Sequence, residues 1–210
     1  MTGSLLSLAL FVFGPGPLQA AVFQAAGDKR NIVTFESQAP LESIIGRTSA
    51  LTARLDVDPA NFPGAKGRFE VDLGALETGL QMRDDHMKGA SFLDVEKFPK
   101  AVFEITGIKA ASISVLANMK PVDFEALGRF TVHGVTQKIS VKATATYMKE
   151  SDATRSRLPG DLIRVAASFS IRLPDFGIQR PEMFFYRLSE SVDIKLDFFT
   201  SNAAPADPKP

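Results

Sequence analysis

Alternation of apolar and polar residues along most of the chain is the feature that most limits the fold. In the segment 136–148, one side is apolar at alternate positions from Ile139 to Tyr147, and the other side carries lysine, serine and threonine. Because successive side chains of a β-strand point to opposite faces, this pattern predicts a strand with one buried face and one solvated face. Similar patterns predict about eight strands. They lie near residues 30–37, 43–57, 66–73, 101–109, 121–133, 136–148, 161–173 and 189–199.

Eight long amphipathic strands favour a closed antiparallel barrel, because closure removes the exposed edges of a sheet. A barrel of about eight strands is just wide enough for packed side chains or for one small ligand. Three small residues, Ala143, Ala145 and Ala167, are expected on inward faces. They either leave room for a ligand or make space for large neighbours. The stretch "VHGVT" predicts a tight hairpin turn in which Gly134 takes a positive φ, and His133 is expected to be solvated there.

The composition excludes several classes of function. The formal net charge is zero, from 24 basic and 24 acidic residues, which argues against a protein that binds nucleic acid. The chain has no cysteine, so it can form neither a disulfide framework nor a thiolate metal site. Two histidines are too few for a multi-histidine metal site. The 17 phenylalanines can build a large core, with apolar surface to spare for a ligand.

The two ends of the chain differ from the rest in composition. Residues 1–20 are apolar and uncharged; the run from Leu5 to Phe13 is too short to span a bilayer and suits the apolar region of a signal peptide. Cleavage is expected after Ala20, although the basic residues that usually precede the apolar region of a signal peptide are missing between Met1 and Leu5. The alternative is an N-terminal core segment, which the sequence "GPGP" disfavours. Residues 201–210, "SNAAPADPKP", predict a disordered tail, which leaves a single exported domain at 21–200.

The alternation is interrupted once, at residues 74–99, by a segment with helical spacing. The spacing is carried by Leu76, Leu80, Arg83 and Met87. Gly79 interrupts it, so two short helices fit the pattern as well as one. Arg83 would then share the apolar stripe while Asp85 points to solvent. Because an unpaired buried charge is costly, Arg83 needs a partner. The candidates are Asp84, a glutamate of the barrel and an anionic group of a ligand.

This segment carries a resemblance to a known family. The run "RDDHMKGASFLDVEKFPKAVFEITGI" resembles the signature of the YceI-like family: Arg-Asp-x-His, a short apolar stretch, and Phe-Pro before a strand that contains phenylalanine. The pieces "VTFESQAPLESIIGRT", "GRFEVDLGALETG", "GRFTVHGVTQKISV" and "FSIRLPDFGI" are similar to other parts of the family and occur in its order. Together they span about residues 31–199.

The resemblance implies a lipocalin-like antiparallel barrel. Together with the eight strands and the helical segment read from the residues, it leads us to expect an all-β, eight-stranded barrel with a short helical segment over one end. Members are usually exported to the bacterial periplasm and are associated with binding polyisoprenoids or related long apolar lipids, including isoprenoid quinones. Many members carry a histidine in the second strand region, where this chain has "APLESIIGRT". This departure is compatible with a branch that binds a different ligand.

Six residues are candidate ligand contacts. They are Arg83, Asp84, His86, Phe92, Phe103 and Phe169. At the barrel mouth, Arg83 and His86 could bind a phosphate or a quinone carbonyl, and the phenylalanines could form walls for an apolar chain. The structural alternative is that Arg83 and Asp84 fasten the helical segment to the barrel, that His86 caps a strand carbonyl, and that the phenylalanines are core.

We therefore expect non-catalytic binding, sequestration or transport of a long apolar lipid in the cell envelope. The alternative is a barrel filled by its own side chains, whose loops bind an envelope partner. Neither a nucleophile–base–orienter set nor a phosphate-binding glycine motif is present, so catalysis lacks support; a hydrolase or isomerase that uses His86 with Asp84 is the third hypothesis. No cofactor, metal or nucleic acid is expected, nor a membrane-spanning segment, and a homodimer is left open.

Overall fold

The computed structural model describes residues 20–25, 28–109, 111 and 113–203, and in them ten strands form one antiparallel sheet. The strands are β1 (Ala21–Ala25), β2 (Ile32–Gln38), β3 (Ser43–Thr48), β4 (Leu51–Val57), β5 (Lys66–Asp72), β6 (Lys100–Lys109), β7 (Pro121–Val132), β8 (Val135–Met148), β9 (Leu162–Arg172) and β10 (Ser191–Ser201). The helices are α1 (Gln81–Lys88) and α2 (Asp152–Arg155), with 3-10 turns η1 (Phe62–Gly64), η2 (Leu73–Ala75), η3 (Leu173–Phe176) and η4 (Glu182–Phe184).

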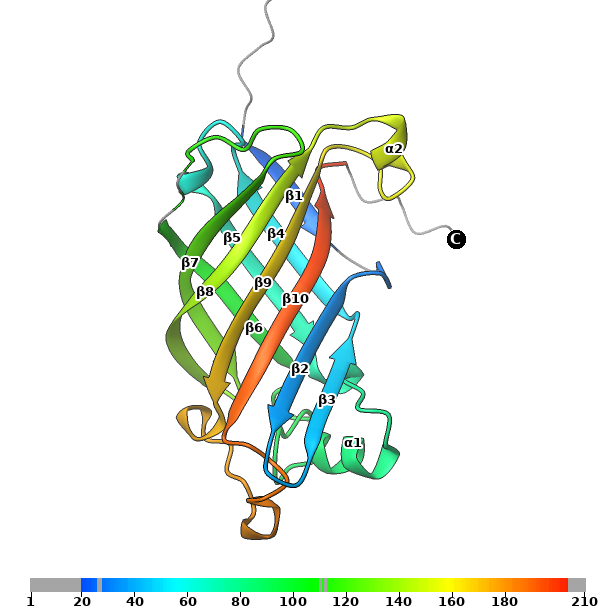
Figure 1. Cartoon of the computed structure of the whole chain (residues 1–210), viewed down its shortest axis with the longest axis vertical. Coiled ribbons are helices and arrows are strands. Elements are labelled where there is room, and N and C mark those ends of the chain that lie inside the picture. The colour runs from blue at the N-terminus through cyan, green and yellow to red at the C-terminus, as the bar shows by residue number, and fades with distance from the viewer. Residues whose placement is uncertain (1–19, 26–27, 110, 112, 204–210) are drawn as a thin grey trace, which may run out of the picture.

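The ten strands close an eight-stranded barrel, because two of the eight positions around the barrel are each occupied by two short strands. Strands β1 and β2 lie end to end along β10 and share one position. Strands β3 and β4 share the next position, with β2 paired to β3 and β1 paired to β4. The sheet order is β1-β4-β5-β6-β7-β8-β9-β10-β2-β3, and the contact between Gln24 of β1 and Ser201 of β10 closes it. Figure 1 shows the resulting barrel, with α1 near one end and α2 near the other. The predicted all-β barrel with a helical segment over one end is confirmed.

The alternation of the sequence located most strand boundaries to within about two residues, with three differences. Strand β1 was not predicted. The segment 43–57 is divided between β3 and β4. The predicted tail begins too early at residue 201, because β10 includes Ser201, which is buried, and Asn202 N donates to Asp161 O. The predicted signal peptide lies outside the described residues except for Ala20, and so do residues 204–210 of the predicted tail.

The hairpin between β7 and β8 has the predicted tight turn. His133 has φ 52° and Gly134 has φ 74°, and two successive positive φ values define a type I′ turn. A Cβ on Gly134 would lie 2.5 Å from the Phe98 ring, so this position also lacks room for a side chain. His133 is not solvated as expected: its Nδ1 lies 3.2 Å from the carbonyl oxygen of Phe176, and its ring packs against Phe98. The histidine therefore ties the turn to η3.

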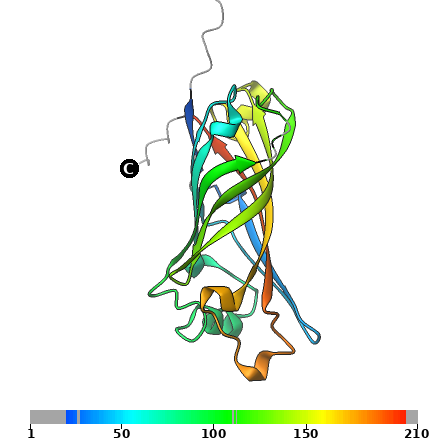
Figure 2. The ribbon, with the colours of Figure 1, turned by 90° about the vertical axis from the view of Figure 1, so that its left-hand side faces the viewer.

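Two clusters of buried side chains fill the two ends of the barrel. The upper core, toward α2, contains Phe23, Leu55, Tyr147 and Phe198. The lower core, toward α1, contains Leu93, Phe130, Ile171, Phe176 and Ile178. In the view of Figure 2, α1, η3 and η4 lie together at the lower end. The space between the two cores is the candidate site.

Candidate functional site

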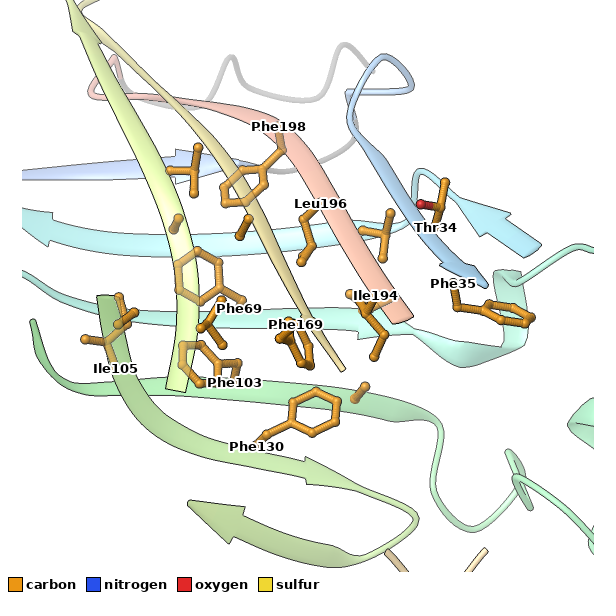
Figure 3. A pocket seen from close by; sticks show the side chains of 18 of the residues that line it. Thr34, Phe35, Phe69, Phe103, Ile105, Phe130, Phe169, Ile194, Leu196 and Phe198 are labelled. Atoms are coloured by element: carbon orange, nitrogen blue, oxygen red, sulfur yellow. The ribbon is translucent and has the colours of Figure 1, made fainter. Parts of the chain in front are cut away.

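An apolar cavity of about 130 Å³ lies in the middle of the barrel. Its wall includes Phe69, Phe103, Phe130, Phe169, Ile194 and Leu196, and Figure 3 shows these side chains around one space. Thr34 is the one lining residue with a polar side chain, and none of the lining residues is titratable. A molecule in this cavity would therefore meet hydrocarbon on almost every side.

Three phenylalanines of the wall are only partly buried, although their strands turn them inward, whereas Phe130 is buried at 6% exposure. Phe69, Phe103 and Phe169 are half-buried, whereas Phe23 and Tyr147 of the upper core are 1% and 2% exposed. In a close-packed core, inward-facing aromatic side chains lose nearly all their accessible surface. The remaining accessible surface of the wall residues shows that the middle of the barrel is not filled.

A pair of alanines contributes to this hollow. Ala143 of β8 is paired with Ala167 of β9, and both line the cavity. Ala145, the next inward position of β8, is 1% exposed and packs in the upper core, where it is paired with Val165 of β9. Small inward residues therefore have both of the expected roles. Ala143 and Ala167 border free space, and Ala145 makes space for larger neighbours.

Glycines on neighbouring strands leave room for two of the aromatic rings. A Cβ on Gly128 would lie 2.4 Å from the Phe103 ring, and a Cβ on Gly46 would lie 2.1 Å from the Phe35 ring. Both glycines sit inside strands, where glycine often marks the close approach of another group. They allow Phe103 and Phe35 to lie close against the barrel wall. The sequence carries a signal for both positions, because each glycine interrupts a strand pattern.

The segment from Leu76 to Lys88, here called the strap, pairs with β3 through one isolated bridge. Its first part forms a backbone bridge in which Arg47 N donates to Glu77 O at 2.8 Å and Glu77 N donates to Arg47 O at 3.0 Å. Its second part is α1, which begins at Gln81 after Gly79 has taken φ +84°. Leu76 lines the cavity, so the strap is also part of the cavity wall.

Arg83 fastens α1 to the barrel. Its Nη1 donates to Glu42 Oε1 at 2.9 Å, its Nε donates to Thr78 Oγ1 at 2.8 Å, and its Nη2 donates to the Thr78 carbonyl at 3.1 Å. Glu42 lies in the turn between β2 and β3, so this ion pair joins the strap to that hairpin. Asp84 completes the fastening, because its Oδ1 accepts from Thr78 N at 2.9 Å and from Thr78 Oγ1 at 2.5 Å.

The helical stripe predicted from the sequence is wrong in part. Leu80 is 58% exposed, whereas Asp84 is buried at 7% exposure. The difference arises because α1 begins only at Gln81, so Leu80 has extended backbone and does not share the face of the helix that carries Arg83 and Met87. Asp85 is exposed as expected, and Arg83 is half-buried with Glu42 as its partner, one of the alternatives considered.

The six candidate contacts fall into two groups in the structure. Phe103 and Phe169 line the cavity. Phe92 packs against the lower core and is not among the lining residues, and neither are Arg83, Asp84 and His86. His86 is exposed, and within the described part of the chain it has no hydrogen bond to Asp84. A role for these residues in ligand binding stays a prediction.

Perturbed titratable groups lie away from the cavity. On the outer surface of β5 and β6, a hydrogen bond from Lys100 and another from Arg68 lower the pKa of Glu70 below its usual range. In the upper core, burial and a hydrogen bond to Asp161 raise the pKa of Tyr147. Both sites have evident structural roles.

The residues that the structure describes hold no group of three or more histidine, cysteine, aspartate or glutamate side chains placed to bind a metal ion. Among those same residues, every helix is too short or too polar to cross a membrane.

Comparison with known proteins assigns the family. A sequence model of the YceI-like domain matches residues 27–199. The chain belongs to the YceI-like domain family. This YceI-like chain is 28% identical over 199 residues to a UPF0312 protein of Pseudomonas savastanoi pv. phaseolicola, covering 91% of this chain and 95% of that protein. It is also 28% identical over 124 residues to a UPF0312 protein of Pseudomonas putida strain GB-1, but there it spans only 58% of the relative's length.

Solved structures share the YceI-like fold at low sequence identity. BcnA of Burkholderia cenocepacia matches with a TM-score of 0.66 and 17% identity, over 83% of this chain and 99% of that chain. A polyisoprenoid binding domain from Saccharophagus degradans matches with a TM-score of 0.66 and 16% identity, over 89% of this chain and all of that domain (100%). The YCEI protein of Campylobacter jejuni matches with a TM-score of 0.59 and 20% identity, over 76% and 85% of the two chains. These likenesses confirm the barrel fold.

Proposed function

We propose that this protein binds a long apolar lipid, an isoprenoid chain, by enclosing part of it in the barrel, without catalysis. The observation that carries the proposal is the cavity between the two cores, whose wall is hydrocarbon apart from Thr34. Burial of apolar surface is the main favourable term for such a ligand, and it needs no specific polar contact. A polar head group would find no partner in the cavity, so the head group stays outside the wall.

The isoprenoid class is supported by the family and by one structural neighbour. The chain belongs to the YceI-like domain family, and the domain from Saccharophagus degradans that shares its fold is described as polyisoprenoid binding. The aromatic wall formed by Phe69, Phe103, Phe130 and Phe169 suits a chain that is apolar throughout its length.

The size of the cavity sets how much of the lipid fits without rearrangement. At about 130 Å³ it is smaller than typical ligand pockets of roughly 300–1,000 Å³. It is close to the roughly 150 Å³ of an engineered apolar cavity that binds benzene. One isoprene unit is of that size, and its five carbons would contribute up to about 4 kcal/mol before ordering costs. A longer chain requires the wall phenylalanines to change rotamer, or continues outside the barrel.

We also propose that the protein acts in the cell envelope, in the periplasm or outside the cell. The apolar, uncharged stretch from Leu5 to Phe13 followed by "LQA" supports export by a signal peptide. In such a compartment a protein that shields an apolar chain from water could sequester it or carry it.

The test is to express the chain with its own leader in a bacterial host and purify it from the periplasm. The purified protein is then extracted with organic solvent, and the extract is analysed by mass spectrometry. We expect an isoprenoid lipid or quinone in stoichiometric amount. The Ala143→Leu variant, which places a larger side chain in the cavity, is expected to yield much less. An empty extract, repeated after exposure to total lipid from the native organism, would contradict lipid binding and favour the filled-barrel interaction module.

A further inference from the structure

Large apolar side chains are exposed on the loops and short helices at the α1 end of the barrel. Met183 of η4 is 79% exposed, Met82 of α1 is 73% exposed, Leu41 in the turn after β2 is 71% exposed, and Tyr186 is 69% exposed. We call these four residues, together with Leu80, the rim patch. Contiguous exposed apolar surface on a protein marks a site of interaction with another protein or with a membrane.

The residues of the rim patch belong to one end of the molecule. Leu41 N donates to the carbonyl oxygen of Tyr186 at 2.8 Å, which joins the β2–β3 turn to the loop after η4. The ion pair between Arg83 and Glu42 joins α1 to the same turn. The β2–β3 turn is therefore the point at which all three segments meet, and Figures 1 and 2 both show them at the lower end of the barrel.

We propose that the rim patch inserts into the surface of an uncharged, zwitterionic lipid bilayer. Its side chains stand on three separate segments at one end of the barrel: the β2–β3 turn, the strap with α1, and η4 with the residues that follow it. Separate apolar tips can enter a fluid interface without matching its shape, and Tyr186 combines an apolar ring with a polar hydroxyl, as suits the boundary between lipid and water.

The charge of this end decides which lipid surface it fits. The three segments, residues 39–45, 76–88 and 179–190, contain six acidic and four basic residues. An excess of acidic residues disfavours attachment to an anionic surface, which basic clusters attract. Adsorption must then come from the apolar side chains, and we expect it to depend little on salt.

Two chain segments carry residues of both the rim patch and the proposed binding cavity, and this step rests on the proposed function. Leu76 at the start of the strap and Phe35 in the β2–β3 hairpin both line the cavity. The patch residues Leu80 and Leu41 follow them in the same two segments. A bilayer bound at the rim patch would therefore lie beside the two segments that reach the cavity.

The experiment is co-sedimentation of the protein with phosphatidylcholine vesicles that contain no isoprenoid, at about 0.1 M and about 1 M salt, across which the Debye length falls from roughly 10 to 3 Å. The test variant is Met82→Ser with Met183→Ser. The matched control is Met119→Ser: Met119 is 61% exposed, but its N donates to the carbonyl of Tyr147 in the upper core, at the opposite end. We expect the wild type and the control to sediment equally at both salt concentrations, and the double variant to partition at least about tenfold less.

Three results would overturn the proposal. The wild type could remain in the supernatant, the double variant could sediment as well as the control, or binding could require anionic lipid and vanish at high salt. Light scattering measures the mass of the protein in solution. A wild type that is dimeric and does not bind vesicles, together with a monomeric double variant, would show that the rim patch is a self-association surface. Solvent extraction of the same proteins separates the two proposals, because wild type that carries lipid but does not bind vesicles leaves lipid binding intact.

Discussion

Replacing Ala143 by leucine tests whether the barrel is hollow. Ala143 borders the cavity, whereas Ala145, two residues along the same face of β8, is packed in the upper core. Leucine adds three carbons, worth about 2.4 kcal/mol if they become fully buried, less about 0.5–1 kcal/mol of side-chain entropy. We therefore expect Ala143→Leu to raise the free energy of unfolding by about 1.5 kcal/mol. The same change at Ala145 meets filled space, and such overpacking typically costs about 1–3 kcal/mol.

The assay is urea unfolding of the two variants and the wild type without added lipid, with thermal melting as a second measure. For a chain of this size, about 1 kcal/mol corresponds to a shift in Tm of roughly 2–4 °C. The expected result is opposite signs: a higher midpoint for Ala143→Leu and a lower midpoint for Ala145→Leu. Equal destabilisation by both substitutions would refute the hollow barrel, because it would show that the space beside Ala143 is already filled.

Further predictions concern the strap, the outer surface and the wall. Arg83→Ala removes the hydrogen bonds to Glu42 and Thr78, and we expect the free energy of unfolding, measured by urea titration, to fall by about 2 kcal/mol. If the variant is as stable as the wild type but loses its bound lipid, Arg83 contacts the ligand instead. Lys100 and Arg68 lower the pKa of Glu70, so its contribution to stability is present at neutral pH and is lost as pH falls below its ordinary value of 4.5. The difference in urea midpoint between neutral and acid pH should therefore shrink in Glu70→Gln, and an unchanged difference would contradict this assignment. Gly128→Ala should lower stability by about 1–3 kcal/mol, because its Cβ would meet an aromatic ring and a backbone oxygen, and an unchanged melting temperature would show that this contact is not tight.

The barrel could be predicted from the sequence because each long strand exposes one face to water and buries the other. That alternation fixes both strand boundaries and inward positions, as in β8 from Val141 to Tyr147. Strand β1 was missed because it has only five residues and directly follows an apolar leader-like stretch. The division between β3 and β4 was missed although the inward positions change phase there: Gly46 and Thr48 are buried in β3, and Leu51 and Ala53 are buried in β4.

The cavity could be predicted only in part, because its shape depends on strand register. Inward alanines were visible in β8 and β9, but the pairing of Ala143 with Ala167 follows from register, which no single strand specifies. The partner of Arg83 could not be located for a similar reason, since Glu42 lies 41 residues away in the chain. The buried face of α1 was mispredicted because its phase depends on where the helix begins.

The most direct test of the central claim is the electron density inside the barrel in a crystal structure of the protein loaded with an isoprenoid lipid. We predict density for a methyl-branched carbon chain between the two cores, in contact with Ala143, Phe169 and Leu196 and without a polar head group among them. Lipid density confined to the outer surface, with the space beside Ala143 occupied by the protein's own side chains, would contradict it.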